Sequence, residues 1–166
     1  MMENKGKGHD VKMNEEMIFQ QIDLIREKTL NEMEDLLEEQ ADLMPRGFRN
    51  TIRWNLGHIY TFQNILLSKF GGKHFETPTR YLELFAPGTK PDDWEGEIPT
   101  LDELKQLLEE QPAKIKEALA GHLDEKAAEP FKSLSTIGEL LNFSMYHEGL
   151  HVGIIKGLKK AYRVAE

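Results

Sequence analysis

The chain has 166 residues, enough for one domain that buries a core without disulfide or metal staples. Its formal net charge of −8 disfavours binding to nucleic acid, because phosphate contacts require a basic face. It contains no cysteine, which excludes disulfides, thiolate metal ligands and a catalytic thiol of the protein's own. The N-terminal residues lack the apolar core of a secretory signal, and no apolar run is long enough to span a membrane. We therefore expect a cytoplasmic protein without a membrane partner.

Residues 1–12 are polar and contain glycine, and we predict a flexible lead-in there, followed by a single domain over residues 13–166. The first helix is predicted from Asn14, as its N-cap, to about Gln40. Its apolar residues recur at spacings of three, four and eight, at Ile18, Ile22, Ile25, Met33 and Leu36. The proline and glycine of the stretch LMPRGFRN then interrupt the helical pattern.

A second helix is predicted over residues 51–70, where Gly71 and Gly72 end it. Residues 71–99 are rich in proline and glycine and are predicted to form a long ordered loop with one short helical turn at residues 81–85. A loop of this length in a small domain usually serves a function or covers a functional site.

Two capping boxes, Thr-x-x-Glu at residues 100–103 and 136–139, predict the starts of two further helices. The apolar stripe of the first consists of Leu101, Leu104, Leu108, Gln111, Ile115 and Leu119. This helix is expected to kink at Pro112 and to stop at Gly121, and the last helix runs to about Tyr162. No segment alternates like a strand for long enough to build a sheet. The sequence therefore predicts an all-α fold, a four-helix bundle.

The last predicted helix carries two histidines in the middle of an inward-facing stripe. The stripe has alternating spacings of four and three and consists of Leu140, Ser144, His147, His151, Ile154 and Leu158. Because His147 and His151 are four residues apart, their imidazoles lie one turn apart on the same face of the helix. Two imidazoles in this relation can hold one metal ion.

A third histidine, His58, lies on a similar apolar stripe of the second predicted helix. Its neighbours on that stripe are Trp54, Phe62 and Ile65. Three neutral imidazole nitrogens with an open coordination position are the arrangement of a catalytic zinc-type site. We therefore predict a metal site at His58, His147 and His151. The alternative is a buried, hydrogen-bonded histidine cluster without a metal.

Residues 147–151 also spell H-E-x-x-H, the motif of zinc proteases. Such proteases need a third ligand downstream of the motif. Ile154 and Gly157 occupy the positions where one branch of these enzymes has glycine and histidine. Other branches use a later glutamate, and the only acidic residue after the motif is Glu166, the last residue of the chain. The sequence therefore does not support a zinc protease.

Two other groups of residues have alternative interpretations. Glu148 is predicted to border the metal face as a general base or as a partner of a metal ligand, and the alternative is a solvated helix glutamate. The aromatic residues of the long loop either wall a substrate pocket or anchor the loop to the core. They are Tyr81, Phe85 and Trp94.

Three stretches of the chain carry a family resemblance. They are TIRWNLGHIYTFQNILL, with the histidine of the second helix, STIGELLNFSMYHEGLHVGII, with His-x-x-x-His followed by glycine, and the loop YLELFAPGTKP. Together they resemble the DinB/YfiT-like metalloenzyme family over about residues 14–162.

The resemblance implies a four-helix bundle in up-down-down-up order. It also implies a divalent metal, often zinc or nickel, held by His58, His147 and His151, and a homodimer. Characterised members of the family include transferases that act with low-molecular-weight thiols such as bacillithiol or mycothiol, and a thiol-dependent isomerase. The resemblance does not fix a role for Glu148.

Two functional hypotheses follow. In the first, the protein is a metal-dependent transferase or hydrolase that activates a low-molecular-weight thiol or water to attack a small-molecule substrate. In the second, it is a non-catalytic, metal-stabilised bundle that binds a partner or small molecule. Gly149, Gly153 and Gly157 form a stripe, extended by Ala161, that suggests close approach of another helix. That helix is either the chain's own first helix or one from a dimer partner.

Overall fold

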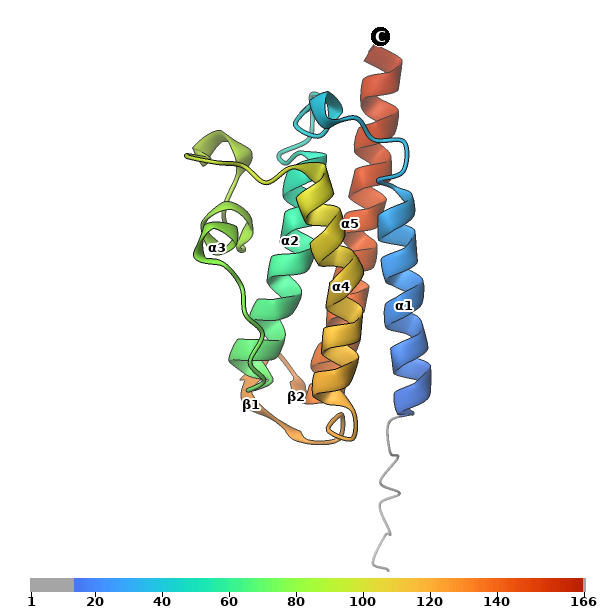
Figure 1. Ribbon diagram of the computed structural model, residues 1–166, viewed down its shortest axis with the longest axis vertical. Coiled ribbons are helices and arrows are strands. Elements are labelled where there is room, and N and C mark those ends of the chain that lie inside the picture. Colours follow the sequence, from blue (N-terminus) through green and yellow to red (C-terminus); the bar gives the residue numbers. More distant parts are fainter. Residues whose placement is uncertain (1–13, 166) are drawn as a thin grey trace, which may run out of the picture.

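Four long helices run side by side along the molecule (Figure 1). The computed structural model describes residues 14–165, so the predicted lead-in lies outside the described residues. The long helices are α1 (Glu15–Asn31), α2 (Ile52–Ile65), α4 (Leu101–Leu119) and α5 (Ile137–Ala165). α1 and α5 run in one direction, and α2 and α4 run in the other, which confirms the all-α, up-down-down-up bundle. No helix within residues 14–165 has both the length and the apolarity needed to cross a membrane.

α1 begins where the sequence predicts but ends earlier. The side chain of Asn14 accepts a hydrogen bond from a backbone amide of the first turn (3.1 Å), as the predicted N-cap should. The helix stops at Asn31, and a short 3₁₀ turn, η1 (Glu38–Gln40), replaces its predicted end. Met33 and Leu36 are buried even so, because hydrogen bonds between residues three apart keep the intervening turns on the core side.

α2 follows its N-cap Thr51 and continues into a π-helical turn, η2 (Leu66–Phe70). The helical segment thus covers residues 52–70, within one residue of the prediction. Gly72 follows with a φ of 68°, a left-handed conformation that glycine adopts without strain.

The long connection after α2 contains two short helices, α3 (Thr79–Phe85) and η3 (Pro91–Asp93). α3 packs directly on α2. Tyr81 and Phe85 are buried in the larger apolar cluster, and Trp94 packs against that cluster. The loop aromatics therefore anchor the loop to the core, which was the alternative to a substrate-pocket role.

α4 opens with the predicted capping box, in which Thr100 and Glu103 each bond the other's backbone amide. The helix runs through Pro112 without ending. Proline has no N–H, so it cannot bond the Leu108 carbonyl four residues earlier. Arg26 fills that place, since its Nη1 donates to the Leu108 oxygen at 2.6 Å.

A two-stranded antiparallel hairpin joins α4 to α5. Its strands are β1 (Lys126–Phe131) and β2 (Leu134–Thr136). The prediction that no segment alternates for long enough to build a sheet is wrong here, although the sheet has only two strands. The pairing depends on a tight loop and on tertiary packing, because the ring of Phe131 lies 4.8 Å from that of Phe70 and 5.3 Å from that of Phe143. The second capping box, Thr136 with Glu139, then opens α5 as predicted.

A layer of buried polar residues crosses the middle of the bundle. α1 and α2 each pack on both α4 and α5, and the buried apolar residues form two clusters. Along each long helix, buried polar residues lie between the apolar residues of one cluster and the apolar residues of the other. We call this set the polar layer: Arg26, Thr29, Gln63, Gln111, Ser144 and Glu148. All four long helices contribute to it, so it ties their relative positions together.

Candidate metal centre

The three predicted histidine ligands come together between α2 and α5. His58 projects from α2, and His147 and His151 project from successive turns of α5. One ring nitrogen from each lies within 4.8 Å of the others, a spacing at which the three could hold a single metal ion. His58 is buried and His147 is half-buried, so solvent reaches the cluster at His147.

Hydrogen bonds at Nδ1 fix the ring orientation of two of the histidines, and with it the direction of their Nε2 atoms. The Nδ1 of His58 lies 2.6 Å from the carbonyl oxygen of Phe85, and the Nδ1 of His151 lies 2.7 Å from Oδ1 of Asn55. Because a carbonyl oxygen only accepts, each Nδ1 carries the proton and donates it. The Asn55 amide cannot be turned round, because its Nδ2 donates to the Thr51 carbonyl oxygen (2.7 Å).

The Nε2 lone pairs of His58 and His151 are therefore free to bind a metal. The Nε2 of His147 lies 3.2 Å from the Nε2 of His151, so the third ring is directed to the same place. Two facing lone pairs would repel each other, so a proton or a metal ion must stand between them. The residues present thus fit a metal ion, with protein acceptors holding the distal nitrogens of two ligands.

Aromatic rings keep the imidazoles in position. Trp54 stacks on His58 with 4.4 Å between ring centroids, and Phe62 stacks on His147 at 3.9 Å. Both aromatic residues belong to the stripe of α2 that the sequence predicted around His58. Such stacking restricts the rotation of the rings and so keeps the nitrogens directed at one point.

Burial keeps the imidazoles neutral. Desolvation, with additional effects of the nearby His151, His58 and Lys132 charges, lowers the pKa of His147 to about 3. Desolvation and the His58 charge lower the pKa of His151 to about 4. Desolvation also lowers the pKa of His58, against the opposing hydrogen bond to Phe85. Imidazole binds metals in its neutral form, so at neutral pH the cluster is ready to act as a ligand set.

The structure does not bring Glu148 to the three histidines. Its side chain is buried in the polar layer, where the carboxylate accepts hydrogen bonds from Arg26 Nε (2.8 Å) and Thr29 Oγ1 (2.6 Å). The interpretation as a solvated helix glutamate is therefore wrong. Within the described part of the chain, the group of residues able to hold a metal consists of the three histidines without Glu148.

The predicted inward stripe of α5 is correct except at one position. Leu140, Ser144 and Leu158 are buried, whereas Ile154 is 40% exposed and the neighbouring Ile155 is fully buried. Residue spacings that alternate between four and three average 3.5 residues, whereas a straight α-helix has 3.6 residues per turn. A stripe with these spacings therefore shifts gradually around the helix. Ile154 lies where this drift brings the stripe to the surface.

The glycine stripe of α5 faces the chain's own residues at two of its positions. A Cβ placed on Gly149 would lie 3.8 Å from Ile25 of α1, and one placed on Gly157 would lie 3.5 Å from Phe48. A Cβ on Gly153 would meet no atom of the described residues within 4 Å. The chain's own first helix is therefore the neighbour at Gly149, whereas Gly157 faces the segment before α2 and Gly153 faces open space.

Sequence reasoning missed the two acceptors that orient the ligands. Asn55 could have been found from the sequence, because it is a polar residue one turn before His58 in the otherwise apolar run WNLGHIY. Phe85 contributes a backbone carbonyl, which any residue could supply, so its role leaves no signal in the sequence.

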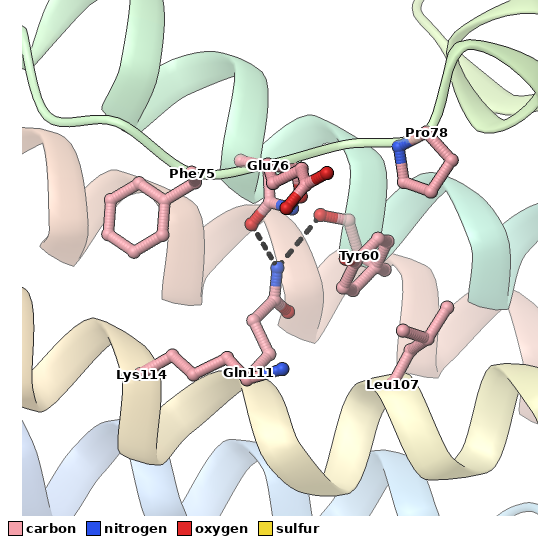
Figure 2. A pocket seen from close by; sticks show the side chains of 8 residues that line it. Tyr60, Phe75, Glu76, Pro78, Leu107, Gln111 and Lys114 are labelled. Carbon is pink, nitrogen blue, oxygen red and sulfur yellow. Dashed lines mark hydrogen bonds between the residues drawn. The ribbon is translucent and has the colours of Figure 1, made fainter.

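A separate cavity of about 320 Å³ lies between α2, α4 and residues 75–78 (Figure 2). The described residues that line it include none of the three histidines. Its central polar group is the Gln111 amide, whose Nε2 donates to the Tyr60 carbonyl oxygen (2.9 Å) and to Asn64 Oδ1 (2.6 Å). Its Oε1 accepts from Arg26 (3.0 Å). This amide is fully engaged within the protein, so we assign the candidate function to the histidine cluster.

Fold and site together define a class of protein, the all-α bundle with a three-histidine group that could hold a metal ion. The chain belongs to the DinB superfamily, whose family model matches residues 21–155. Among solved structures, it resembles a conserved protein from Enterococcus faecalis, with a TM-score of 0.66 and 14% sequence identity. That match covers 90% of this chain and 97% of the other, and it shows that the two share a fold. The comparison with curated proteins found no match.

Proposed function

We propose that this protein is a divalent-metal enzyme, a transferase or hydrolase that activates a low-molecular-weight thiol or water at His58, His147 and His151. Zinc and nickel are the proposed metals, because imidazole ligands suit both. The proposed substrate is a small electrophilic molecule, and the proposed location is the cytoplasm.

One observation carries this proposal: three neutral imidazoles converge, and hydrogen bonds leave the Nε2 lone pairs of His58 and His151 facing the common point. Three protein ligands leave a coordination position open, as in catalytic zinc sites. Glu148, the carboxylate next to His147 in the sequence, is bound to Arg26 and does not supply a fourth ligand. This favours an enzyme over the non-catalytic, metal-stabilised bundle, which would need a closed site.

The protein's own groups would prepare the reaction in two ways. Asn55 and the Phe85 carbonyl orient two of the ligands. Trp54 and Phe62 exclude water from one side of the site. A bound divalent ion would supply the remaining chemistry, by lowering the pKa of a coordinated thiol or water so that it is a nucleophile at neutral pH.

The test is a thiol-transfer assay on zinc- and nickel-loaded protein with bacillithiol, mycothiol and simple thiols, against an aromatic chloride as the electrophile. We expect metal-dependent acceleration by the natural protein and none by the His147→Ala/His151→Ala variant. If the zinc- and nickel-loaded protein gives no transfer with any thiol, and a cobalt-loaded sample shows no change in its absorption spectrum when the thiols are added, the non-catalytic bundle is the better account.

A homodimer is part of the proposal. Exposed apolar side chains lie on α1 and α5, and three of them line adjoining surface hollows between the two helices. The four side chains are Met17, Leu24, Tyr146 and Leu150. An apolar face of this kind on a small bundle favours association with a second copy. Leu150→Glu should produce monomers in light-scattering measurements, whereas Leu37→Glu, at an equally exposed leucine outside this face, should not. A dimer that survives Leu150→Glu would contradict the assignment of this face.

A further inference from the structure

The loop of the β1–β2 hairpin begins with Lys132 in an unusual conformation. Its φ is 55°, and within residues 14–165 it is the only residue other than glycine with a positive φ. Hairpin loops of two residues normally place glycine or asparagine at such a position, because a side chain makes the left-handed conformation unfavourable. The fold itself does not require lysine here, and backbone strain of this kind tends to occur at functional sites.

The ammonium group of Lys132 lies over two aromatic rings. Its Nζ is 5.0 Å from the ring centroid of Phe143 and 5.7 Å from that of Phe131. The side chain is exposed, and it makes no ion pair with any residue in the described part of the chain. In a protein of net charge −8, an unpaired cation held over two rings is a ready site for an anion.

A wall of aromatic rings connects this cation to the histidine cluster. The Phe143 ring lies 6.4 Å from that of Phe62, and the Phe62 ring stacks on His147 at 3.9 Å. Phe62 and Phe143 are only half-buried, so part of this wall is open to solvent.

We propose that Lys132 binds the anionic end of a substrate or thiol whose reactive end meets the three-histidine site. The body of that molecule would lie along Phe62 and Phe143, so the ligand class is a carboxylate with a short apolar chain. This inference deepens the proposed function and rests on it.

The test uses the full chain loaded with Co²⁺, whose thiolate charge-transfer absorption reports thiol binding. Mercaptoacetate, 3-mercaptopropionate and 6-mercaptohexanoate are each titrated beside the mercapto alcohol of the same length. At the length that reaches Lys132, the carboxylate should bind more tightly than the alcohol. Lys132→Gln should reduce this preference about threefold to fivefold, the effect of losing one exposed ion pair, and Lys132→Arg should keep it.

The matched control is Lys69→Gln. Lys69 is also an exposed lysine with its Nζ over a phenylalanine ring, 5.3 Å from the centroid of Phe70. We expect it to leave the carboxylate preference unchanged. An equal preference in the natural protein and in Lys132→Gln would overturn this inference and leave the metal site intact. If the natural protein gave no cobalt spectrum at all, the proposed function would fail, and this inference with it.

Discussion

At the scale of single residues, the site depends on which nitrogen of each imidazole carries the proton. The sequence predicted the histidines, because their spacing and their apolar neighbours are visible along each helix. The hydrogen-bond acceptors of His58 and His151 were not predicted from the sequence, for two different reasons. Asn55 is a single polar residue with no periodic pattern, and Phe85 acts through its backbone from a helix that follows the ligand by 27 residues.

The role of Asn55 can be tested by its removal. In Asn55→Ala, the His151 Nδ1–H loses its acceptor, so the ring is free to turn and to change tautomer. We expect zinc affinity to fall by about 10- to 100-fold, as measured by competition with a chromogenic chelator. Asn142→Ala, at an exposed asparagine of α5, is the control and should bind as the natural protein does. Unchanged affinity in Asn55→Ala would show that another group orients His151.

At the scale of elements, the capping residues predicted helix starts correctly, and helix ends were harder to predict. Asn14, Thr100 and Thr136 each open the expected helix, because a cap is a local hydrogen bond that the sequence specifies. The predicted end of α1 was wrong, because the helical spacing of apolar residues continues through the turns after Asn31. The hairpin was missed because its pairing rests on packing between distant aromatic residues.

The contact between α2 and α3 holds one side of the metal centre. A Cβ on Gly57 would lie 2.5 Å from the Phe85 ring, whose backbone carbonyl orients His58. Gly57→Ala must therefore displace Phe85, and it should lower the unfolding free energy by about 1–3 kcal/mol and weaken zinc binding. Denaturant unfolding and chelator competition measure the two effects.

The control for this change is Gly153→Ala, in the middle of α5. Because a Cβ there meets no described atom within 4 Å, alanine should raise the unfolding free energy, by up to about 1 kcal/mol, through helix propensity alone. If both substitutions had the same effect, close packing at Gly57 would not explain the result.

At the scale of the whole molecule, the polar layer divides the core and fixes the four helices relative to one another. One feature of the sequence indicated this polar layer, but the prediction did not use it. The apolar stripe of the first helix has a gap of eight between Ile25 and Met33, and Arg26 and Thr29 lie within that gap on the buried face. Periodicity identifies apolar faces, but it cannot show that a buried arginine on one helix meets a glutamate on another.

The ion pair of this layer can be broken from one side. Glu148→Ala leaves the Arg26 charge buried without its acidic partner, so the unfolding free energy should fall by about 3–5 kcal/mol. Metal content per folded chain should stay the same, since Glu148 is not in the group of residues able to hold a metal. Glu117→Ala, at an exposed glutamate of α4, should change stability by less than about 0.5 kcal/mol. Loss of metal without loss of stability in Glu148→Ala would instead indicate a role at the metal.

The histidines should make the metal-free protein sensitive to mild acid. In the unfolded chain, imidazole titrates near pH 6.5, whereas in the folded protein the pKa is about 3 for His147 and about 4 for His151. As the pH falls below about 6.5, the unfolded state takes up protons first, so stability is lost progressively toward about pH 4. The urea midpoint of chelator-treated protein should therefore fall between about pH 7 and about pH 5. The fall should be smaller in His147→Ala/His151→Ala, and an equal fall in both would contradict this assignment.

The most direct test of the central claim is the metal content of untagged protein by mass spectrometry, compared with that of the His147→Ala/His151→Ala variant. We predict about one divalent ion per chain in the natural protein and none in the variant, because both ligands from α5 are then missing. No metal in either protein, even after incubation with zinc and nickel, would contradict the account. The three histidines would then be a hydrogen-bonded cluster of the core.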